Sequence, residues 1–270
     1  MDKLIITVAP NGPVATKEHT PHVAVTADEV IEQGIACWEA GASILHYHAR
    51  DKDQKASLDY DYFGRVLEGL RKHTTLIVQI STGWGLDDRE GRIRAVDLRP
   101  DMMSLNVGSV NFGPGAYVNR AADAEYWAGK MLEFGVRPEI ECFDASHVET
   151  GIRLWKMGLI EDPPFFDFVL GVPNAISYTP RNLQMMLDLL PAGARWSCIG
   201  IARAQLPVTT LGIVMGGNCR VGIEDNIYYS RGVLATNVQL VERTVRLAKE
   251  LQREIASPEE ARQLLGIRNS

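Results

Sequence analysis

The sequence predicts an α/β fold, a TIM (β/α)8 barrel built as a single catalytic domain over residues 1–270. Short apolar runs rich in β-branched residues alternate with amphipathic stretches along the chain. Eight such βα units in about 250 residues is the size of this barrel, and neither a linker nor a change of composition divides the chain. A doubly wound open sheet is the alternative fold. It is less favoured because the first turn reads Ala9-Pro10-Asn11-Gly12-Pro13 and lacks the GxGxxG pattern.

The expected elements follow from local signals in chain order. A strand over residues 4–8 comes first, and a helix then starts after Thr26, which can form a capping box with Glu29, and ends at Gly41. Later helices start at residues 179–180 and 257–258, where a capping side chain is followed by proline. The other expected strands cover residues 43–48, 76–80, 102–106, 139–143, 165–170, 195–201 and 220–222, and the other expected helices cover residues 60–72, 122–134, 205–215 and 237 to about 255.

Composition and charge argue against several classes of protein. The net charge is −6 and the charged residues are scattered, so nothing favours binding to nucleic acid or to an anionic membrane. No apolar stretch is long enough to span a bilayer, and the first residues lead into a strand without the layout of a signal peptide. The four cysteines are widely spaced, which favours buried thiols over disulfides. We therefore expect a cytoplasmic protein.

The tripeptide His46-Tyr47-His48 at the end of an apolar run is the most informative local feature. Side chains on a strand alternate between its two faces, so both histidines should point the same way. Two imidazoles that converge at the end of a strand suit a metal ion such as zinc. The spacing is equally compatible with two ordinary strand histidines, so this pattern alone leaves both interpretations open.

Polar residues follow most of the predicted strands, at the end where barrel enzymes place their active sites. These residues are Asn11, His46, His48, Arg50, Ser81, Thr82, Ser104, Asn106, Glu139, Glu141, Arg203, Gln205, Glu224 and Asp225. Several have plain structural alternatives. Ser81 and Thr82 could cap a turn, Asn106 could be a turn residue, and the acidic pair at 224–225 could simply lie in solvent.

Buried carboxylates are the next candidates for the site. Glu139 and Glu141 share one face of their strand, and an inward carboxylate needs a cation or hydrogen-bond partners because burial of a lone charge is costly. We therefore expect at least one of them in the site and count Glu141 among the catalytic candidates. A catalytic zinc generally has three protein ligands. Glu224 is the expected third ligand, and a His2Glu site suits the polarisation of carbonyl oxygens.

Over nearly its whole length, the chain resembles the family of β-keto acid cleavage enzymes, typified by the 3-keto-5-aminohexanoate cleavage enzyme. The resemblance rests mainly on two segments, His46-Tyr47-His48-Ala49-Arg50 and Arg220-Val221-Gly222-Ile223-Glu224-Asp225-Asn226, which together are quite specific. Shorter matches lie at residues 39–42, 79–83, 104–106, 138–144 and 168–172.

The resemblance implies a TIM-barrel transferase, usually a homotetramer, with Zn²⁺ or another divalent metal. It assigns the metal to His46, His48 and Glu224, and a catalytic pair to Arg220 and Asp225. It places substrate contacts at Ser81, Thr82, Trp84, Ser104 and Asn106. The implied reaction joins a β-keto acid to acetyl-CoA, the co-substrate, and yields acetoacetate and a new acyl-CoA.

The sequence departs from the typical family member in two places. The aminohexanoate enzyme has an acidic residue after its first strand that meets the substrate ammonium, and alignment of residues 10–16 places Val14 there. A valine cannot pair with a cation, so we expect a substrate with an uncharged acyl tail and no amino group. The segment at residues 172–175 is poorer in glycine than in many relatives, which leaves the shape of that loop open.

Three other functions remain open from the sequence. A barrel metal-dependent hydrolase also uses HxH, but usually after the first strand and with later histidines, where this chain has only His147 nearby. A metal-dependent carbon–carbon lyase would act without coenzyme A. A non-enzymatic binding protein would need no metal. A Schiff-base aldolase is disfavoured because no lysine lies at the strand ends considered above.

Overall fold

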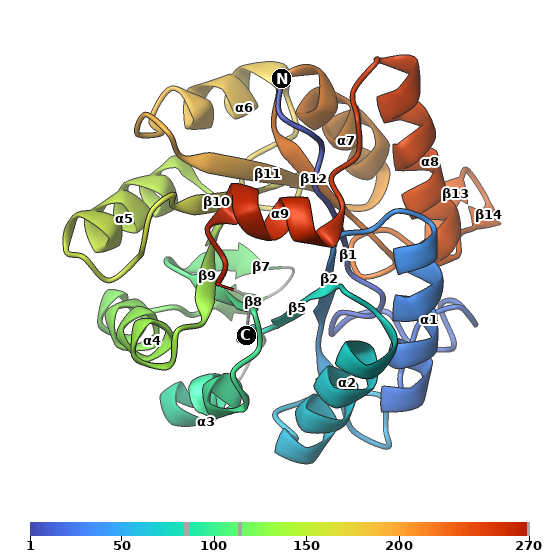
Figure 1. Ribbon diagram of the computed structural model, residues 1–270, viewed down its shortest axis with the longest axis horizontal. Coiled ribbons are helices and arrows are strands. Elements are labelled where there is room, and N and C mark those ends of the chain that lie inside the picture. The colour runs from blue at the N-terminus through green and yellow to red at the C-terminus, as the bar shows by residue number, and fades with distance from the viewer. Residues whose placement is uncertain (84–86, 113–114, 269–270) are drawn as a thin grey trace.

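A closed barrel of parallel strands forms the centre of the molecule. The computed structural model describes residues 1–83, 87–112 and 115–268. The barrel strands are β1 (Ile6–Val8), β2 (Ile44–Tyr47), β5 (Ile77–Ile80), β6 (Met102–Asn106), β9 (Arg137–Cys142), β10 (Phe165–Leu170), β11 (Arg195–Gly200) and β12 (Asn218–Val221). They close in the order β1-β12-β11-β10-β9-β6-β5-β2, with helices around them (Figure 1). The predicted TIM-barrel fold is therefore confirmed.

Helices connect the barrel strands and cover their outer faces. They are α1 (Ala27–Glu39), α2 (Tyr60–His73), α3 (Arg89–Ile93), α4 (Ala121–Phe134), α5 (Ala145–Lys156), α6 (Pro180–Leu187), α7 (Gln205–Val214), α8 (Asn237–Glu250) and α9 (Pro258–Leu265). Capping boxes at Thr26, Thr236 and Ser257 open α1, α8 and α9. Within the described residues, no helix combines the length and the apolar character that a membrane crossing requires.

Short antiparallel pairs of strands extend from the barrel. They are β3 (Ala49–Arg50) with β4 (Ala56–Ser57), β7 (Val110–Phe112) with β8 (Gly115–Tyr117), and β13 (Tyr228–Ser230) with β14 (Val233–Leu234). The first pair directly follows β2, and the second follows β6. Both pairs therefore extend the chain beyond the ends of barrel strands, where polar residues were expected to gather.

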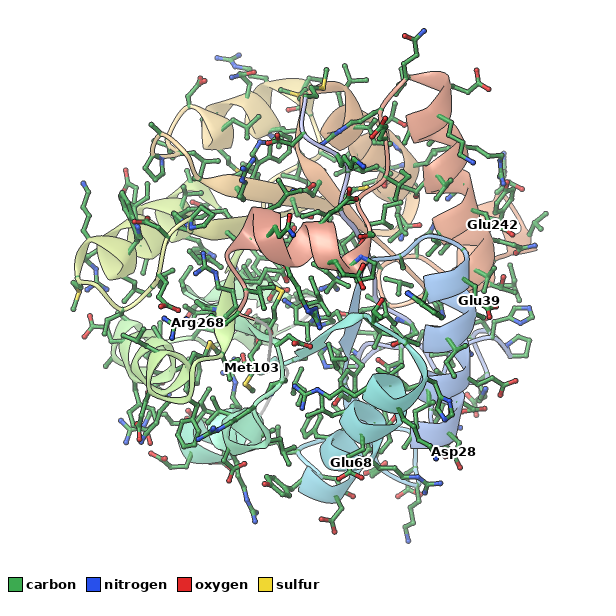
Figure 2. All side chains as sticks on the ribbon, viewed as in Figure 1. Asp28, Glu39, Glu68, Met103, Glu242 and Arg268 are labelled. Atoms are coloured by element: carbon green, nitrogen blue, oxygen red, sulfur yellow. The ribbon has the colours of Figure 1, made fainter. Side chains whose placement is uncertain are left out.

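The barrel strands bury different side chains on their two faces. Outward side chains such as Tyr47 and Phe168 pack in the main core with residues of the surrounding helices. Charged side chains, among them Asp28, Glu68 and Glu242, are exposed on the outer surfaces of the helices (Figure 2). This division leaves the inward faces of the strands to form the interior of the barrel.

Apolar side chains close one end of that interior. The inward side chains near the starts of five strands pack against α9, and the residues of this cluster include Ile5, Ile44, Ile77, Met102, Phe165, Ala261 and Leu265. In Figure 1, α9 lies across this end of the barrel. The inward polar side chains lie beyond this apolar layer, nearer the C-terminal ends of the strands.

The structure corrects the end of the long helix expected to reach about residue 255. That helix, α8, ends at Glu250. Gln252 takes a positive φ of 56°, and the backbone N–H of Arg253 bonds back to the helix at Ala248. The chain then turns to the barrel and Ile255 pairs with the segment before β1. A backbone return of this kind leaves no trace in helical periodicity.

Two helices were missing from the sequence prediction, and two strands start earlier than expected, β9 at Arg137 and β12 at Asn218. α3 has only five residues and continues into a 3-10 turn, so it is too short for a periodic pattern. α5 follows Asp144, whose side chain caps the Ser146 N–H, a signal that the sequence did contain. β12 begins at Asn218 rather than at residue 220, because the Asn218 side chain accepts a bond from the Ile5 N–H and joins this end of the barrel.

Candidate metal centre and active site

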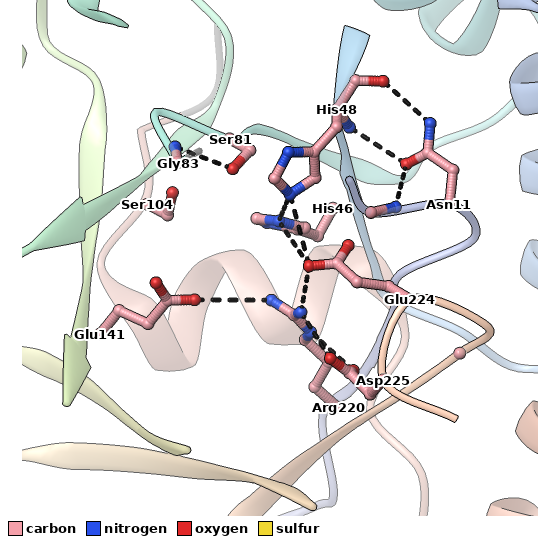
Figure 3. Close-up of polar contacts among 12 residues, drawn as sticks. Asn11, His46, His48, Ser81, Gly83, Ser104, Glu141, Arg220, Glu224 and Asp225 are labelled. Carbon is pink, nitrogen blue, oxygen red and sulfur yellow. Dashed lines mark hydrogen bonds and ion pairs between the residues drawn. The ribbon is translucent and has the colours of Figure 1, made fainter. Parts of the chain in front are cut away.

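Three potential metal ligands meet at the mouth of the barrel (Figure 3). His46 lies in β2, His48 follows it, and Glu224 lies in the loop after β12. Their ligand atoms all lie within 4.8 Å of one another, and no other group of three such residues occurs in the described part of the chain. Glu224 Oε1 is 3.3 Å from His48 Nε2 and 3.8 Å from His46 Nε2. The structure thus brings together the three residues that the sequence pointed to.

The chemistry of these residues fits a divalent ion. Gln79 Oε1 lies 2.8 Å from His46 Nδ1, which fixes the imidazole and leaves Nε2 toward Glu224. Burial and then the charge of Arg220 lower the pKa of His46 to about 3, so the ring is neutral, the form that binds metals. Glu224 Oε2 is buried and has no partner among the described residues. A cation would satisfy that oxygen, and His2Glu is a known catalytic zinc donor set.

The carboxylate of Glu224 stays charged despite its burial. Burial alone would raise its pKa, but the charge of the nearby Arg220 above all outweighs that effect and holds the pKa well below its ordinary value. Arg220 Nη2 lies 2.5 Å from Glu224 Oε1. A carboxylate that is ionised before a cation arrives needs to lose no proton on binding it.

The loop after β1 supports two of the three potential ligands. The side chain of Asn11 binds the backbone of His48 on both sides, accepting from His48 N at 3.1 Å and donating to His48 O at 2.8 Å. Gly12 packs on Glu224, because a Cβ added to Gly12 would lie 2.2 Å from Glu224 Cγ. Gly12 also has a positive φ of 63°. This loop therefore fixes how closely His48 and Glu224 approach.

Replacing Gly12 with alanine is expected to weaken zinc binding by about ten-fold to 100-fold, because the new Cβ displaces the Glu224 side chain. Alanine at Gly135 is the matched control. That glycine also has a positive φ, of 70°, but a Cβ added to it would meet no described atom within 4 Å. Competition with a zinc chelator measures both affinities. Equal affinities in the two variants would show that the contact with Glu224 is unimportant.

A buried ion-pair network adjoins the three ligands. Arg220 binds Asp225 through two hydrogen bonds, Nε to Oδ2 at 3.0 Å and Nη2 to Oδ1 at 2.8 Å. Its Nη1 lies 3.8 Å from Glu141 Oε1 (Figure 3). Burial, opposed by Arg220, raises the pKa of Asp225 to about 6 and that of Glu141 to about 7. Both carboxyl groups therefore exchange protons near neutral pH, as general acids and bases do.

The ends of β5 and β6 supply uncharged polar groups. Ser81 Oγ accepts a bond from the Gly83 N–H at 3.0 Å. The hydroxyl of Thr82 donates to the Ser104 carbonyl at 2.7 Å, and the Ser104 hydroxyl accepts from the Thr82 N–H. Both polar atoms of the Asn106 side chain are buried without partners among the described residues. Trp84 lies outside the described residues.

Several of these groups line one pocket, but His46, Thr82, Ser104 and Asn106 do not. The pocket contains about 550 Å³ of empty space, part of it open to solvent. Its polar wall consists of His48, Ser81, Glu141, Arg220, Glu224 and Asp225. Its apolar wall consists of Pro13, Val14, Phe112, Tyr117, Phe143, Val169, Ile199 and Ile201. Of the apolar residues, the sequence had indicated Val14 alone, because apolar residues at strand ends look like core.

A second group of polar residues fills the barrel interior behind this pocket. Glu139 Oε2 accepts from Gln79 Nε2 at 2.9 Å, but Glu139 Oε1, both oxygens of Asp167 and the Ser197 hydroxyl have no partner among the described residues. Burial raises the pKa of Glu139 to about 7 and that of Asp167 well above its ordinary value. Asp167 was missed from the sequence, although an aspartate flanked by Phe166 and Phe168 is itself unusual in a buried strand.

The raised pKa of Glu139 predicts how stability depends on pH. The folded protein keeps this proton up to about pH 7, while the unfolded chain loses it near 4.5. The folded state binds more protons between these values, so stability should fall as pH rises through that range, by up to about 3 kcal/mol. Urea unfolding of metal-free protein at about pH 5 and about pH 8 measures this fall. Glu141, Asp167 and Asp225 also have raised pKa values and contribute to the pH dependence of stability, so Glu139→Gln should remove only the share that belongs to Glu139. Glu242→Gln should leave the dependence of wild type unchanged, and an equally unchanged dependence in Glu139→Gln would contradict the assignment.

The remaining residues singled out in the sequence do not line the pocket. His147 Nδ1 accepts a bond from the Phe143 N–H, and His147 is not part of the candidate metal group. Gln205 binds the Gly222 carbonyl, which supports the loop that carries Glu224. Arg203 is exposed. Arg50 donates to the backbone carbonyls of Asn11 and Gly12 in the loop after β1 and to that of Gln54 between β3 and β4, so it holds these two loops together.

Comparisons with known proteins place the chain in a family. A family model described as beta-keto acid cleavage enzyme matches residues 3–267. The chain is 44% identical, over 99% of both chains, to a 3-keto-5-aminohexanoate cleavage enzyme of Fusobacterium nucleatum. It is 37% identical, over 97% of this chain and 94% of the relative, to a 3-oxoadipate:acetyl-CoA acetyltransferase of Cupriavidus necator. A solved binary complex of ObcA with oxaloacetate superposes with a TM-score of 0.80 over 92% of this chain and 68% of that chain, at 19% identity, which shows a shared fold.

Proposed function

The chain belongs to the β-keto acid cleavage enzyme family, and from that premise we propose that it converts a β-keto acid and acetyl-CoA into acetoacetate and a new acyl-CoA. The observation that carries this proposal is that the group formed by His46, His48 and Glu224 lies beside the Arg220–Asp225 pair. Of these five residues, all but His46 line one pocket. The name of the Cupriavidus necator relative, which includes acetyl-CoA, supports the choice of co-substrate.

In this proposal His46, His48 and Glu224 hold one divalent ion, Zn²⁺ or another metal. A divalent ion in that position supplies Lewis-acid polarisation of a carbonyl oxygen. The protein's own part is to keep His46 neutral, which burial and Arg220 favour, and to keep Glu224 ionised, which Arg220 favours against the effect of burial. Gln79 and Asn11 hold the two histidines in place from outside the site.

Uncharged groups bind the substrate carboxylate in this proposal. Ser81 lines the pocket, and Thr82 and Ser104 brace the backbone behind it through their mutual hydrogen bonds. The unpartnered Asn106 amide supplies a further donor. Hydrogen bonds to a charged acceptor are stronger than neutral ones, so a few of them can orient a carboxylate without a cation in contact. The backbone near Trp84 is an additional proposed contact.

Asp225 is the proposed base. It removes a proton from C2 of the β-keto acid, while its hydrogen bonds to Arg220 keep the carboxylate oriented. The C2 carbanion attacks the acetyl carbon of acetyl-CoA, and the coenzyme A thiolate leaves. That thiolate then attacks C3, the C2–C3 bond breaks, and C2 regains a proton to give acetoacetate. Glu141 faces the same pocket and can hold a proton near neutral pH, so it is the second proton carrier proposed.

The pocket favours an uncharged, apolar acyl tail on the substrate. Val14 lies on the pocket wall at the position where the aminohexanoate enzyme is expected to have an acid. Phe143, Val169 and Ile199 form an apolar cluster on the same pocket. Removing apolar surface from water contributes roughly 25 cal/mol per Å², whereas an ammonium placed there would lose its hydration without a partner.

Changing Val14 to glutamate should therefore shift preference toward β-keto acids that carry an ammonium group. We expect kcat/KM for 3-keto-5-aminohexanoate to rise by up to about five-fold relative to an uncharged analogue of equal length, the size of one exposed ion pair of about 1 kcal/mol. Val14→Gln is the matched control, because it has the same shape without the charge. An equal shift in both variants, or none, would contradict the role of Val14.

Mass spectrometry of the products tests the proposed reaction. A panel of β-keto acids with apolar, anionic and amino tails is supplied with and without acetyl-CoA. The proposal predicts an acyl-CoA that matches the tail, formed only when both substrates are present. Cleavage without acetyl-CoA would instead indicate a carbon–carbon lyase, and hydrolysis of lactones or amides would indicate a metal-dependent hydrolase.

The sequence-based expectations of a homotetramer and of a cytoplasmic location remain part of this proposal. Light scattering coupled to size exclusion tests the first, because four copies of a 29.9 kDa chain are readily separated in mass from one or two. The single-domain organisation expected from the sequence is tested by one cooperative unfolding transition seen with two different probes.

A further inference from the structure

A buried arginine lies directly behind the carboxylate-binding loop. Arg92, in α3, is 4% exposed. Its Nε donates to the Thr82 carbonyl at 2.7 Å, and its Nη2 donates to the Tyr117 hydroxyl at 3.0 Å and to Asn119 Oδ1 at 2.7 Å. The guanidinium also lies over the Trp127 ring, 4.2 Å from its centroid. One side chain thus connects the loop after β5 to β8 on the pocket wall.

The charge of Arg92 has no carboxylate partner among the described residues. All of its hydrogen-bond acceptors are neutral oxygens, on two backbone carbonyls, one hydroxyl and one amide. Asp87 is close enough to feel its charge, but the Asp87 side chain is 71% exposed and is bound by Arg120. Buried charges are normally paired, so an unpaired one beside a pocket indicates that the ligand provides the opposite charge.

We propose that Arg92 is a positioning residue that supplies the positive potential for the substrate carboxylate, acting through the loop at residues 81–83. This inference rests on the proposed function, since it takes the ligand to be a β-keto acid. Arg92 itself does not line the pocket, whereas Ser81, Gly83 and Tyr117 do.

Two physical effects act together in this arrangement. The Thr82 carbonyl and the Gly83 N–H belong to one peptide group, so a charge-assisted bond to the carbonyl polarises the N–H that faces Ser81 Oγ. The charge also acts directly across a poorly solvated region, where electrostatic attraction is stronger than in water. Neither effect requires Arg92 to touch the ligand.

The opposite end of the barrel provides a matched control. Arg253 is also buried and also donates to backbone carbonyls, those of Ile213, Gly217 and Asp2. It has no contact with the pocket. Neutralising Arg253 removes a buried charge and its hydrogen bonds, and so reproduces the purely structural cost of the same change at Arg92.

The experiment compares one anion with its neutral isostere. Acetoacetate and acetoacetamide are titrated by calorimetry into zinc-loaded wild type, Arg92→Gln, Arg92→Lys and Arg253→Gln. We expect Arg92→Gln to weaken acetoacetate binding by about ten-fold and acetoacetamide binding by less than about two-fold. Arg92→Lys, which keeps the charge, should recover part of the loss. Arg253→Gln should leave both affinities unchanged while lowering the thermal midpoint.

The outcomes distinguish a failure of the electrostatic role of Arg92 from a failure of the proposed function. An equal loss for anion and amide in Arg92→Gln, or no loss, contradicts the proposed electrostatic role. If Arg92→Gln does not fold, Arg92→Met, which removes the charge but keeps a long side chain against the Trp127 ring, is judged by the same criterion, namely whether the loss for acetoacetate exceeds that for acetoacetamide. Failure of wild type to bind acetoacetate at all contradicts the proposed function instead.

Discussion

Replacing His48 with alanine is expected to remove the bound metal and to lower turnover by about 10³-fold or more. His48 Nε2 lies 3.3 Å from both His46 Nε2 and Glu224 Oε1, so its loss leaves two ligands where a catalytic ion generally needs three. Glu224→Gln should have a similar effect, because an amide oxygen is a poor replacement for an ionised carboxylate. Metal content by mass spectrometry and turnover are measured on the same samples.

The matched control for these variants is His73→Ala. His73 is an exposed histidine at the end of α2, outside the candidate metal group. It should retain one metal per chain and full turnover. If His48→Ala or Glu224→Gln also kept stoichiometric metal and full turnover, the assignment of the ligands would be wrong.

Changing Asp225 to asparagine is expected to lower kcat by about 10²-fold to 10⁴-fold while the metal remains bound. Asparagine keeps the size of the side chain and one acceptor for Arg220, but it cannot take a proton from C2. Because the ligand atoms of His46, His48 and Glu224 are unchanged, metal content should stay near that of wild type. Loss of turnover with retained metal separates proton transfer from metal binding.

Asp101→Asn provides the control for this buried pair. Asp101 is buried and bound to Arg262 at 3.2 Å, beside α9 and far from the site along the barrel axis. Its substitution should lower stability and leave kcat within about three-fold of wild type, as expected for a structural ion pair removed from the chemistry. If Asp225→Asn had no larger effect on kcat than Asp101→Asn, Asp225 would not be the base.

The fold and the grouping of the three candidate metal ligands could be predicted because their signals are local or periodic. Alternation along β2 placed His46 and His48 on one face, and barrel topology placed Glu224, distant in sequence, at the same end. The supporting contact of Gln79 with His46 follows from the pairing of β2 with β5, in which these residues are register partners. That pairing is part of any parallel barrel, so it could have been inferred.

Other features could not be predicted because they depend on packing in three dimensions. Val169 and Ile199 look like core residues in sequence, and only the closed barrel shows that they face the pocket. Arg92 lies in the short helix α3 that periodicity missed, and its role depends on the neutral acceptors around it. Asp167 looks like an interruption of an apolar strand until its inward position is known.

We propose above all that this barrel exchanges acyl groups between a β-keto acid and acetyl-CoA. The most direct measurement follows the acetyl carbons with ¹³C in both positions of the acetyl group of acetyl-CoA. If the proposed reaction occurs, acetoacetate should be labelled at C3 and C4 and unlabelled at C1 and C2. The acyl-CoA formed from the tail of the keto acid should be unlabelled. Unlabelled acetoacetate, or cleavage of the keto acid at the same rate when acetyl-CoA is left out, would contradict the proposal.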